Sequence, residues 1–172
     1  MQDYPYNAKI GQTDLMAAAY NNDPAEVTSI LSTPCNIDAQ DTHGMTALMY
    51  AAMQGYPNVV HLLISKKAEL ELQSSQHFTA LMYAVKYRHV ECVKLLLDAG
   101  ADPDVHGDYD TYDTPLTLAA RAGLFQMVRL LVAAGANIGL HGGYSQLTAE
   151  SIARREGHHD VSEYLCYHEK RP

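Results

Sequence analysis

The residues of this chain that could hold a metal ion are concentrated near its C-terminus. His158 and His159 supply two imidazoles, Cys166 a thiol and His168 a third imidazole. These groups bind zinc in sites with spacings such as Cys-x-x-Cys or His-Glu-x-x-His, which this segment lacks. We therefore expect structural roles for these side chains and no bound metal. A metal-binding protein or an enzyme that uses them is the alternative hypothesis.

An acidic segment from Asp108 to Asp113 carries three carboxylates, at positions 108, 110 and 113, and faintly resembles a calcium-binding loop. It lacks the central Gly of such a loop, and Ala119 stands at the twelfth position, where a bidentate Glu is needed. The sequence has no Gly-x-Ser-x-Gly motif, no phosphate-binding Gly loop and no nucleophile placed beside a base. It therefore predicts a protein that is not an enzyme and needs no cofactor.

Any functional residue must be positioned by the elements that the sequence repeats. The segment TALMYAA at residues 46–52 recurs as TALMYAV at residues 79–85, and each copy is followed by a second apolar run. Weaker copies begin at Thr13, Thr114 and Thr148, so successive units are 33, 33, 35 and 34 residues apart. A nearly fixed period in this range indicates a solenoid of stacked units.

Each unit is predicted to contain two amphipathic helices. A Thr before each first helix can accept a hydrogen bond from a free N–H group, and Gly55 and Gly123 suit the tight turns between helices. The apolar residues of both halves follow the i, i+3, i+4 spacing of a helix. Examples are Leu48, Ala51 and Ala52 in a first helix and Val59, Leu62 and Leu63 in a second.

Two of the repeated segments resemble ankyrin repeats, namely DTPLTLAA at residues 113–120 and LLLDAGAD at residues 95–102. The resemblance extends in register over about residues 9–166. It implies an all-α ankyrin-repeat solenoid of stacked helix-turn-helix units with short hairpin loops. In that family the first helices and the hairpins line a concave groove that binds partner proteins. The chain departs from the family pattern at the hairpin tips, where His77 and Tyr112 replace Gly.

The repeats predict a single domain. Residues 9–168 are expected to form it, with residues 1–8 as a loosely ordered lead-in and residues 169–172 as a tail. The last unit has polar residues where the family has apolar ones, which would prevent further stacking, so we expect a monomer. These residues are Glu150, Arg154, Ser162 and Glu163. The repeats are expected at about residues 9–40, 41–73, 74–106, 109–141 and 143–168.

Composition limits the partners and the compartment. The formal net charge of −8 disfavours nucleic acid, and the sequence has no apolar run long enough to span a membrane. Cys35, Cys92 and Cys166 lie in three different units and are interpreted as reduced core thiols, which indicates a reducing compartment. The N-terminus lacks the features of a signal peptide. We expect a cytoplasmic protein, or one in the host cytosol if it is a secreted effector.

The tyrosines divide into two groups. Tyr50 and Tyr83 occupy equivalent places in the repeated segment and are predicted to pack in the core. Others fall at first-helix ends or hairpin tips, which the resemblance places along the groove, where aromatic residues supply contact area at low entropic cost. This second group is Tyr20, Tyr87, Tyr109, Tyr112 and Tyr144.

Charges recur at one place in the repeat. Lys86, Arg121 and Arg155 each occupy the same position near the end of a first helix, while Asp residues gather in the hairpin at 108–113. Two interpretations remain open. The cations and carboxylates neutralise each other within the chain, or they form a mixed-charge groove that holds an extended segment of a partner. The candidate partner-binding residues are Tyr20, Met53, Phe78, Lys86, Tyr87, Asp108, Asp110, Tyr112, Asp113, Arg121, Tyr144 and Arg155.

The resemblance therefore predicts a protein–protein interaction module that binds a partner protein through its concave groove. It would act as an adaptor, an inhibitor or a regulatory subunit, and one version of this hypothesis is a bacterial effector that acts on host proteins. The alternatives are the metal-binding protein or enzyme named above and a structural fragment of a longer ankyrin-containing chain. The fold alone does not identify the partner.

Overall fold

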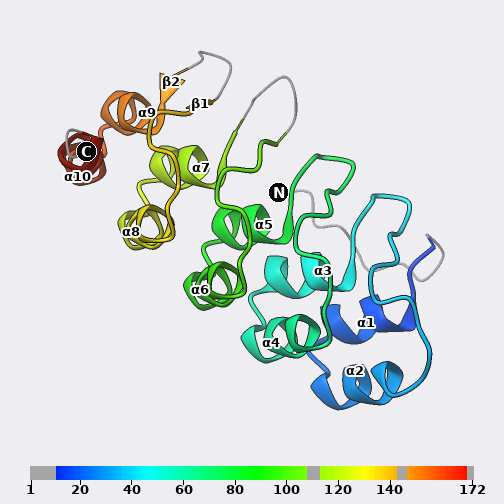
Figure 1. The fold of residues 1–172 in the computed structure, drawn as a ribbon. Helices are drawn as coiled ribbons and strands as arrows, with labels where there is room; N and C mark the ends of the chain where they lie inside the picture. The colour runs from blue at the N-terminus through cyan, green and yellow to red at the C-terminus, as the bar shows by residue number, and fades with distance from the viewer. Residues whose placement is uncertain (1–10, 108–112, 143–146, 170–172) are drawn as a thin grey trace.

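The helices lie in two rows, which Figure 1 shows side by side along the stack. The computed structural model describes residues 11–107, 113–142 and 147–169. The inner row, from which the hairpin loops project, consists of α1 (Asp14–Tyr20), α3 (Ala47–Gln54), α5 (Ala80–Lys86), α7 (Pro115–Arg121) and α9 (Ala149–Arg155). The outer row consists of α2 (Pro24–Leu31), α4 (Pro57–Ser65), α6 (Val90–Asp98), α8 (Phe125–Ala133) and α10 (His159–Glu169).

The only strands in the described residues are β1 (His141–Gly142) and β2 (Leu147–Thr148), which pair antiparallel before α9. Elsewhere the loops before the inner helices, here called fingers, are closed by backbone hydrogen bonds outside any strand, such as that from the Asp41 N–H to the Met45 carbonyl at 3.1 Å. The prediction of an all-α solenoid of helix-turn-helix units with short hairpins is confirmed. The predicted lead-in at residues 1–8 lies outside the described residues.

A threonine is the N-cap of every inner helix. Each Thr has an extended backbone, and its hydroxyl oxygen accepts a hydrogen bond from the N–H group three residues later, which would otherwise lack a partner. The donor–acceptor distances lie between 3.2 and 3.3 Å. The predicted caps are therefore confirmed at Thr46, Thr79, Thr114 and Thr148, and Thr13 caps α1 in the same way.

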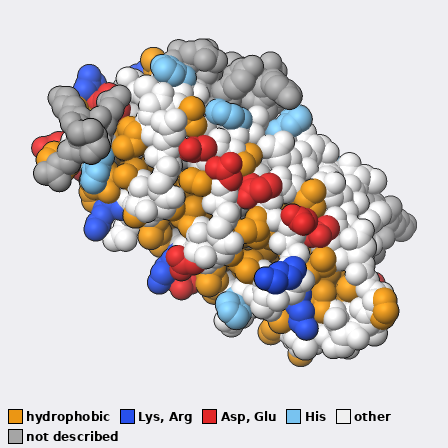
Figure 2. Space-filling view, in the orientation of Figure 1, with side chains coloured by type: hydrophobic (Ala, Val, Ile, Leu, Met, Phe, Trp, Pro, Cys, Tyr) orange, Lys and Arg blue, Asp and Glu red, His pale blue; other side chains and the backbone are white. Residues whose placement is uncertain are grey.

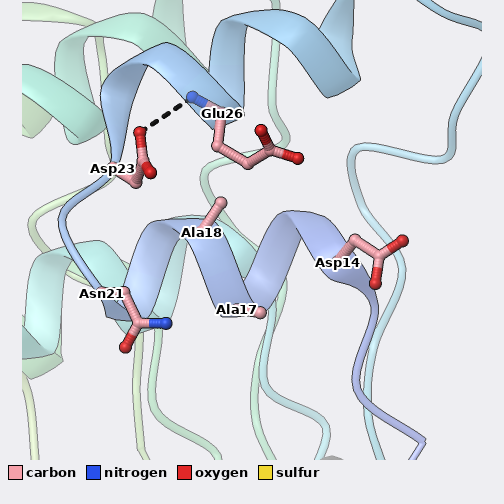
Figure 3. A pocket seen from close by; sticks show the side chains of 6 residues that line it. All are labelled: Asp14, Ala17, Ala18, Asn21, Asp23 and Glu26. Atoms are coloured by element: carbon pink, nitrogen blue, oxygen red, sulfur yellow. Dashed lines mark hydrogen bonds between the residues drawn. The ribbon is translucent and has the colours of Figure 1, made fainter.

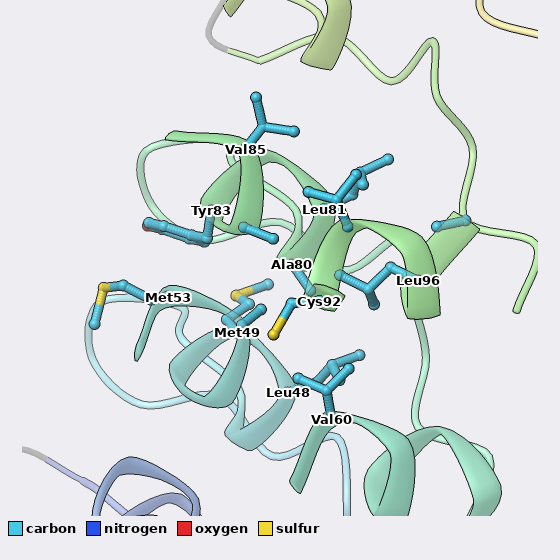
Figure 4. Packing of buried hydrophobic residues seen from close by; sticks show 14 of the residues in the cluster. Leu48, Met49, Met53, Val60, Ala80, Leu81, Tyr83, Val85, Cys92 and Leu96 are labelled. Atoms are coloured by element: carbon cyan, nitrogen blue, oxygen red, sulfur yellow. The ribbon is translucent and has the colours of Figure 1, made fainter. Parts of the chain in front are cut away.

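The core runs through the whole stack between the two rows. Leu48, Leu81 and Leu116, which repeat the same position, are all fully buried, as predicted. Small residues such as Ala51 and Ala84 are also fully buried, and they allow neighbouring inner helices to approach closely. Figure 4 shows side chains from two neighbouring units filling the space between α3, α5 and α6.

The three cysteines are free, but they are not all core thiols. Cys92 is buried on α6, and this burial, followed by the charge of Glu91, raises the pKa of its thiol to about 11, so it stays protonated at neutral pH. Cys35 is exposed and Cys166 is only partly buried, so the prediction of core thiols is wrong for Cys35. Cys35 lies in the loop after α2, outside the apolar stripes of the helices.

Tyr50 and Tyr83 are buried in the core, as predicted, and their hydroxyl groups also hold the bases of the fingers. The Tyr50 hydroxyl donates to Asp41 Oδ2 at 2.6 Å, and the Tyr83 hydroxyl lies 2.9 Å from Ser74 Oγ. Burial, followed by the hydrogen bond with Asp41, raises the pKa of Tyr50 well above its usual value. Each tyrosine thus links an inner helix to its own finger.

Successive units are joined by hydrogen bonds between their loops. In three loops a carboxylate accepts a hydrogen bond from a backbone N–H of the next unit, which satisfies a group that no helix or strand would satisfy. The acceptors Asp38, Glu71 and Asp104 are spaced by 33 residues and bind the N–H groups of Glu69, Asp102 and Asn137 at 2.9, 2.9 and 2.8 Å. The loops are therefore held in register along the stack.

The turn after an inner helix takes one of two forms. After α3 it contains Gly55 in left-handed backbone, and the ring of His89 from the next unit lies where a Cβ would be, 2.3 Å from that position. His89 Nε2 donates to the carbonyl of Met53 at 3.0 Å. Gly123 and His158 repeat this His–Gly contact.

In the turns after α1 and α5 a side chain replaces Gly, whereas the turn after α9 contains Gly157 with no atom within 4 Å of its Cβ position. Asn22 and Arg88 occupy the left-handed position, with φ of 56° and 66°. The residues of the next unit that correspond to the histidines are then Tyr56 and Leu124. A side chain at the turn is therefore found only where no His ring fills its space.

Candidate functional site

The equivalent positions near the C-terminal ends of the inner helices form the candidate site. Their backbone is fixed by the helices, so each side chain starts from the same place in every unit. These positions hold Tyr20, Met53, Lys86, Arg121 and Arg155. Their environments differ, and two of these side chains, Lys86 and Arg121, meet a residue at the base of their own finger.

In the third unit, Lys86 folds back over an aromatic ring. Its Nζ lies 4.7 Å from the centre of the Phe78 ring, within the range of a cation–π interaction. Phe78 is held in turn by an edge contact with Tyr83, with 5.5 Å between ring centres. The ring orients the ammonium group but carries no net charge, so the positive charge of Lys86 is not neutralised by this contact.

In the fourth unit, the Arg121 side chain also extends to the base of its own finger, but there it contacts a carboxylate. Its two guanidinium NH2 groups donate to Asp113 at 2.7 and 2.8 Å, which forms a bidentate ion pair. Asp113 is only 5% exposed, and the hydrogen bonds with it raise the pKa of Arg121 although burial opposes this. This part of the predicted cation row therefore neutralises a carboxylate of its own chain.

The two contacts join residues with the same separation in sequence. Lys86 and Phe78 are eight residues apart, as are Arg121 and Asp113, because both span an inner helix and the base of its finger. The difference is the finger residue, which is aromatic in one unit and acidic in the next. Among the described residues, Lys86 thus has no carboxylate partner, whereas Arg121 has one.

The remaining described candidates are placed as follows. Met53 is only 9% exposed and offers little surface, and its carbonyl accepts the hydrogen bond from His89. Tyr20 is half-buried and contacts the edge of Tyr50, with 5.9 Å between ring centres. Arg155 is exposed and pairs with its neighbour Glu156 at 3.2 Å. The candidates Asp108, Asp110, Tyr112 and Tyr144 lie outside the described residues.

Tyr87 and Arg88 follow Lys86 in the turn after α5. Tyr87 is 43% exposed and is the only exposed large apolar side chain among the described residues of the inner row and its turns. Arg88 is exposed as well, and sequence reasoning did not select it. A signal was available, because Arg88 occupies the place at which three other units have Gly.

The candidate metal ligands near the C-terminus have other contacts. His158 Nε2 donates to the carbonyl of Arg121 at 3.1 Å, and the ring of His168 lies against Tyr164 with 4.3 Å between ring centres. His159 and Cys166 line an open depression on α10. Within residues 11–107, 113–142 and 147–169 no group of three His, Cys, Asp or Glu side chains is arranged to hold a metal ion.

Two acidic surfaces lie elsewhere on the stack. Figure 2 shows a diagonal row of acidic side chains over the loops that lead from the outer helices to the fingers. An open depression of about 250 Å³ lies between α1 and α2 at the N-terminal end of the stack. Figure 3 shows the side chains that line it. Its lining side chains are acidic or small, namely Asp14, Ala17, Ala18, Asn21, Asp23 and Glu26. The cations of the third unit therefore lie in a molecule whose loops are acidic and whose outer row carries further cations, such as Lys66 and Lys67.

Comparison with known families agrees with the repeat and the fold. Residues 15–107 match a model of three ankyrin repeats, and residues 111–142 match a model of a single ankyrin repeat. A search of the curated proteins finds no match. In the described residues no helix is long and apolar enough to cross a membrane. Ankyrin repeats are in general non-catalytic modules for protein–protein interaction. The matched residues cover most of the chain, which therefore belongs to the ankyrin repeat family.

Proposed function

We propose that this protein binds a partner protein through the surface formed by the ends of its inner helices and the fingers. It would act there as an adaptor, an inhibitor or a regulatory subunit, in the cytoplasm or, for a bacterial effector, in the cytosol of a host. The observation that carries this proposal is the exposed Tyr87 beside Lys86, whose ammonium group is oriented by Phe78. Interface energy is concentrated in such aromatic and cationic side chains.

The ion pair next to Lys86 and Tyr87 is expected to support the binding surface without contributing the main contacts with the partner. The pair formed by Arg121 and Asp113 joins α7 to the base of its finger, so it holds the surface rigid. A rigid surface loses less conformational entropy when a partner binds. Lys86 and Tyr87 remain available for contacts with the partner. Tyr20 and Arg155 extend the proposed surface toward the two ends of the stack.

Site-specific photocrosslinking tests the proposal. A photoreactive phenylalanine derivative replaces Tyr87 in one protein and Ser65, at the exposed end of α4, in another. Both proteins are irradiated in extract from the cells that produce the protein, and the adducts are identified by mass spectrometry. We expect one predominant adduct from position 87 and none of the same partner from position 65.

Adduct formation only from position 65 would contradict the proposal, because the partner would then contact the outer row. The control is wild-type protein, which has no photoreactive group and should give no adduct. A melting curve of each labelled protein checks that the substitution leaves the fold intact.

A further inference from the structure

The turn after α5 carries an unfavourable backbone conformation at an exposed cation. Arg88 has a φ of 66°, where the corresponding residues Gly55, Gly123 and Gly157 are glycines. A residue with a Cβ in left-handed backbone costs roughly 1–2 kcal/mol relative to Gly. The packing does not require the arginine, because its side chain is exposed and Leu124 replaces the His ring beside it. Residues held in such conformations concentrate at functional sites.

Lys86 and Arg88 are the cations of the inner row that have no ion-pair partner among the described residues. In the inner helices and the turns after them, Arg121, Arg154 and Arg155 all pair with carboxylates, whereas neither Lys86 nor Arg88 does. The outer row also carries cations without such a partner among the described residues, and two of them serve as the control below. Phe78 lies under Lys86, and Tyr87 lies between the two cations in sequence. We call these four residues, Phe78, Lys86, Tyr87 and Arg88, the basic patch.

We propose that the basic patch binds an acidic segment of the partner protein, with Lys86 and Arg88 pairing with its carboxylates. This inference rests on the proposed function and specifies the chemistry of the partner. An arginine guanidinium binds a carboxylate through two parallel hydrogen bonds, and the ammonium of Lys86 is already oriented by Phe78. Tyr87 supplies exposed aromatic area between the two charges.

The surroundings favour a short acidic peptide over a nucleic acid. Binding to a phosphate backbone draws on many cations along a surface, and the basic patch has two. The protein as a whole carries a formal charge of −8, which repels a long polyanion. A short acidic segment would contact only the basic patch, so the acidic remainder of the protein would repel it less than it repels a long polyanion. Opposite charge also accelerates the encounter with the partner, an effect that salt reduces.

Fluorescence anisotropy with a defined probe tests the inference. The probe is a fluorescein-labelled peptide in which Glu alternates with Ala, and its uncharged counterpart has Gln in place of Glu. The inner variant carries Lys86→Glu and Arg88→Glu. Its control carries Lys66→Glu and Lys67→Glu at the end of α4, which matches it in charge and in backbone, because Lys67 has a φ of 68°. A third variant, Arg88→Gly, removes one cation while relieving the backbone conformation.

We expect the Glu peptide to bind wild-type protein, and the inner variant to weaken its binding by at least about tenfold more than the control does. Arg88→Gly should weaken binding without lowering the melting temperature, so unfolding would not explain the loss. The affinity should fall as salt is added.

Three results would overturn the inference: equal binding of the Gln peptide, equal losses in the inner and control variants, or absence of binding by the Glu peptide. Tighter binding of a thymidine oligonucleotide than of the Glu peptide would overturn it in favour of nucleic acid. If position 87 still forms its photoadduct in any of these cases, the proposed function stands and only the acidic chemistry of the partner is wrong.

Discussion

At the scale of single residues, this repeat is controlled by what lies beside each turn. The His89 ring occupies the space that a side chain at position 55 would need, and it donates to the end of α3. The turn at Arg88 has no such ring beside it and holds a large cation instead. Where the next unit places a His ring beside the turn, the turn residue is Gly, and a side chain is found only where that ring is absent.

The effect of Gly55→Ala tests this contact. Its new Cβ would lie 2.3 Å from the His89 ring in left-handed backbone, so we expect a loss of about 2 kcal/mol or more in the free energy of unfolding. The control is Gly100→Ala, which also has a positive φ of 93° but no atom within 4 Å of the new Cβ. It should cost only about 1 kcal/mol, the backbone term alone. Equal losses in urea denaturation would show that the His ring moves aside freely.

At the scale of helices, the repeated leucine of each inner helix joins neighbouring units. Leu81 on α5 is 1% exposed and belongs to the core shared with α3 and α6. In a stacked repeat each unit contacts only its neighbours, so a defect in the central unit weakens both of its interfaces. Helix α5 is therefore the element on which the continuity of the core depends most.

Truncating this side chain should be costly. We expect Leu81→Ala to lower the free energy of unfolding by about 2–5 kcal/mol, because it leaves a cavity in the core. Val90→Ala, on the neighbouring helix α6 where Val90 is 41% exposed, should cost less than about 1 kcal/mol. Guanidinium denaturation followed by circular dichroism measures both. A loss below about 0.5 kcal/mol for Leu81→Ala would place it outside the core.

The helices and their caps could be predicted from the sequence because they depend on local spacing. Thr79 precedes a run with helical periodicity, and both its cap and the burial of Leu81 follow from that run. The pair formed by Arg121 and Asp113 could be predicted only as one of two possibilities, because it depends on how the finger folds back over α7. Arg88 was missed although it stands where three other units have Gly, because only the structure shows that it keeps the left-handed backbone of those glycines.

At the scale of the whole molecule, the distribution of charge bears more on the binding of a partner than the net charge does. Carboxylates recur along the loops, where Asp38, Glu71 and Asp104 also join neighbouring units, whereas the uncompensated cations Lys86 and Arg88 lie near the middle of the stack. Desolvation raises the pKa of Glu71, and the hydrogen bond from the Asp102 N–H opposes this rise. A partner can thus be oriented by attraction at the centre and repulsion along the loops.

The affinity of the photocrosslinked partner for three proteins tests the central claim most directly. They are wild-type protein, the variant Lys86→Glu with Tyr87→Ala, and the outer-row control Lys66→Glu with Lys67→Glu. Arg121 is left unchanged, because Arg121→Glu would place a second carboxylate against the buried Asp113. Titration calorimetry should show a loss of at least about tenfold, on the order of 1.4 kcal/mol, for the inner variant alone, with its melting temperature nearly unchanged. A loss in the outer-row control with none in the inner variant would contradict the account.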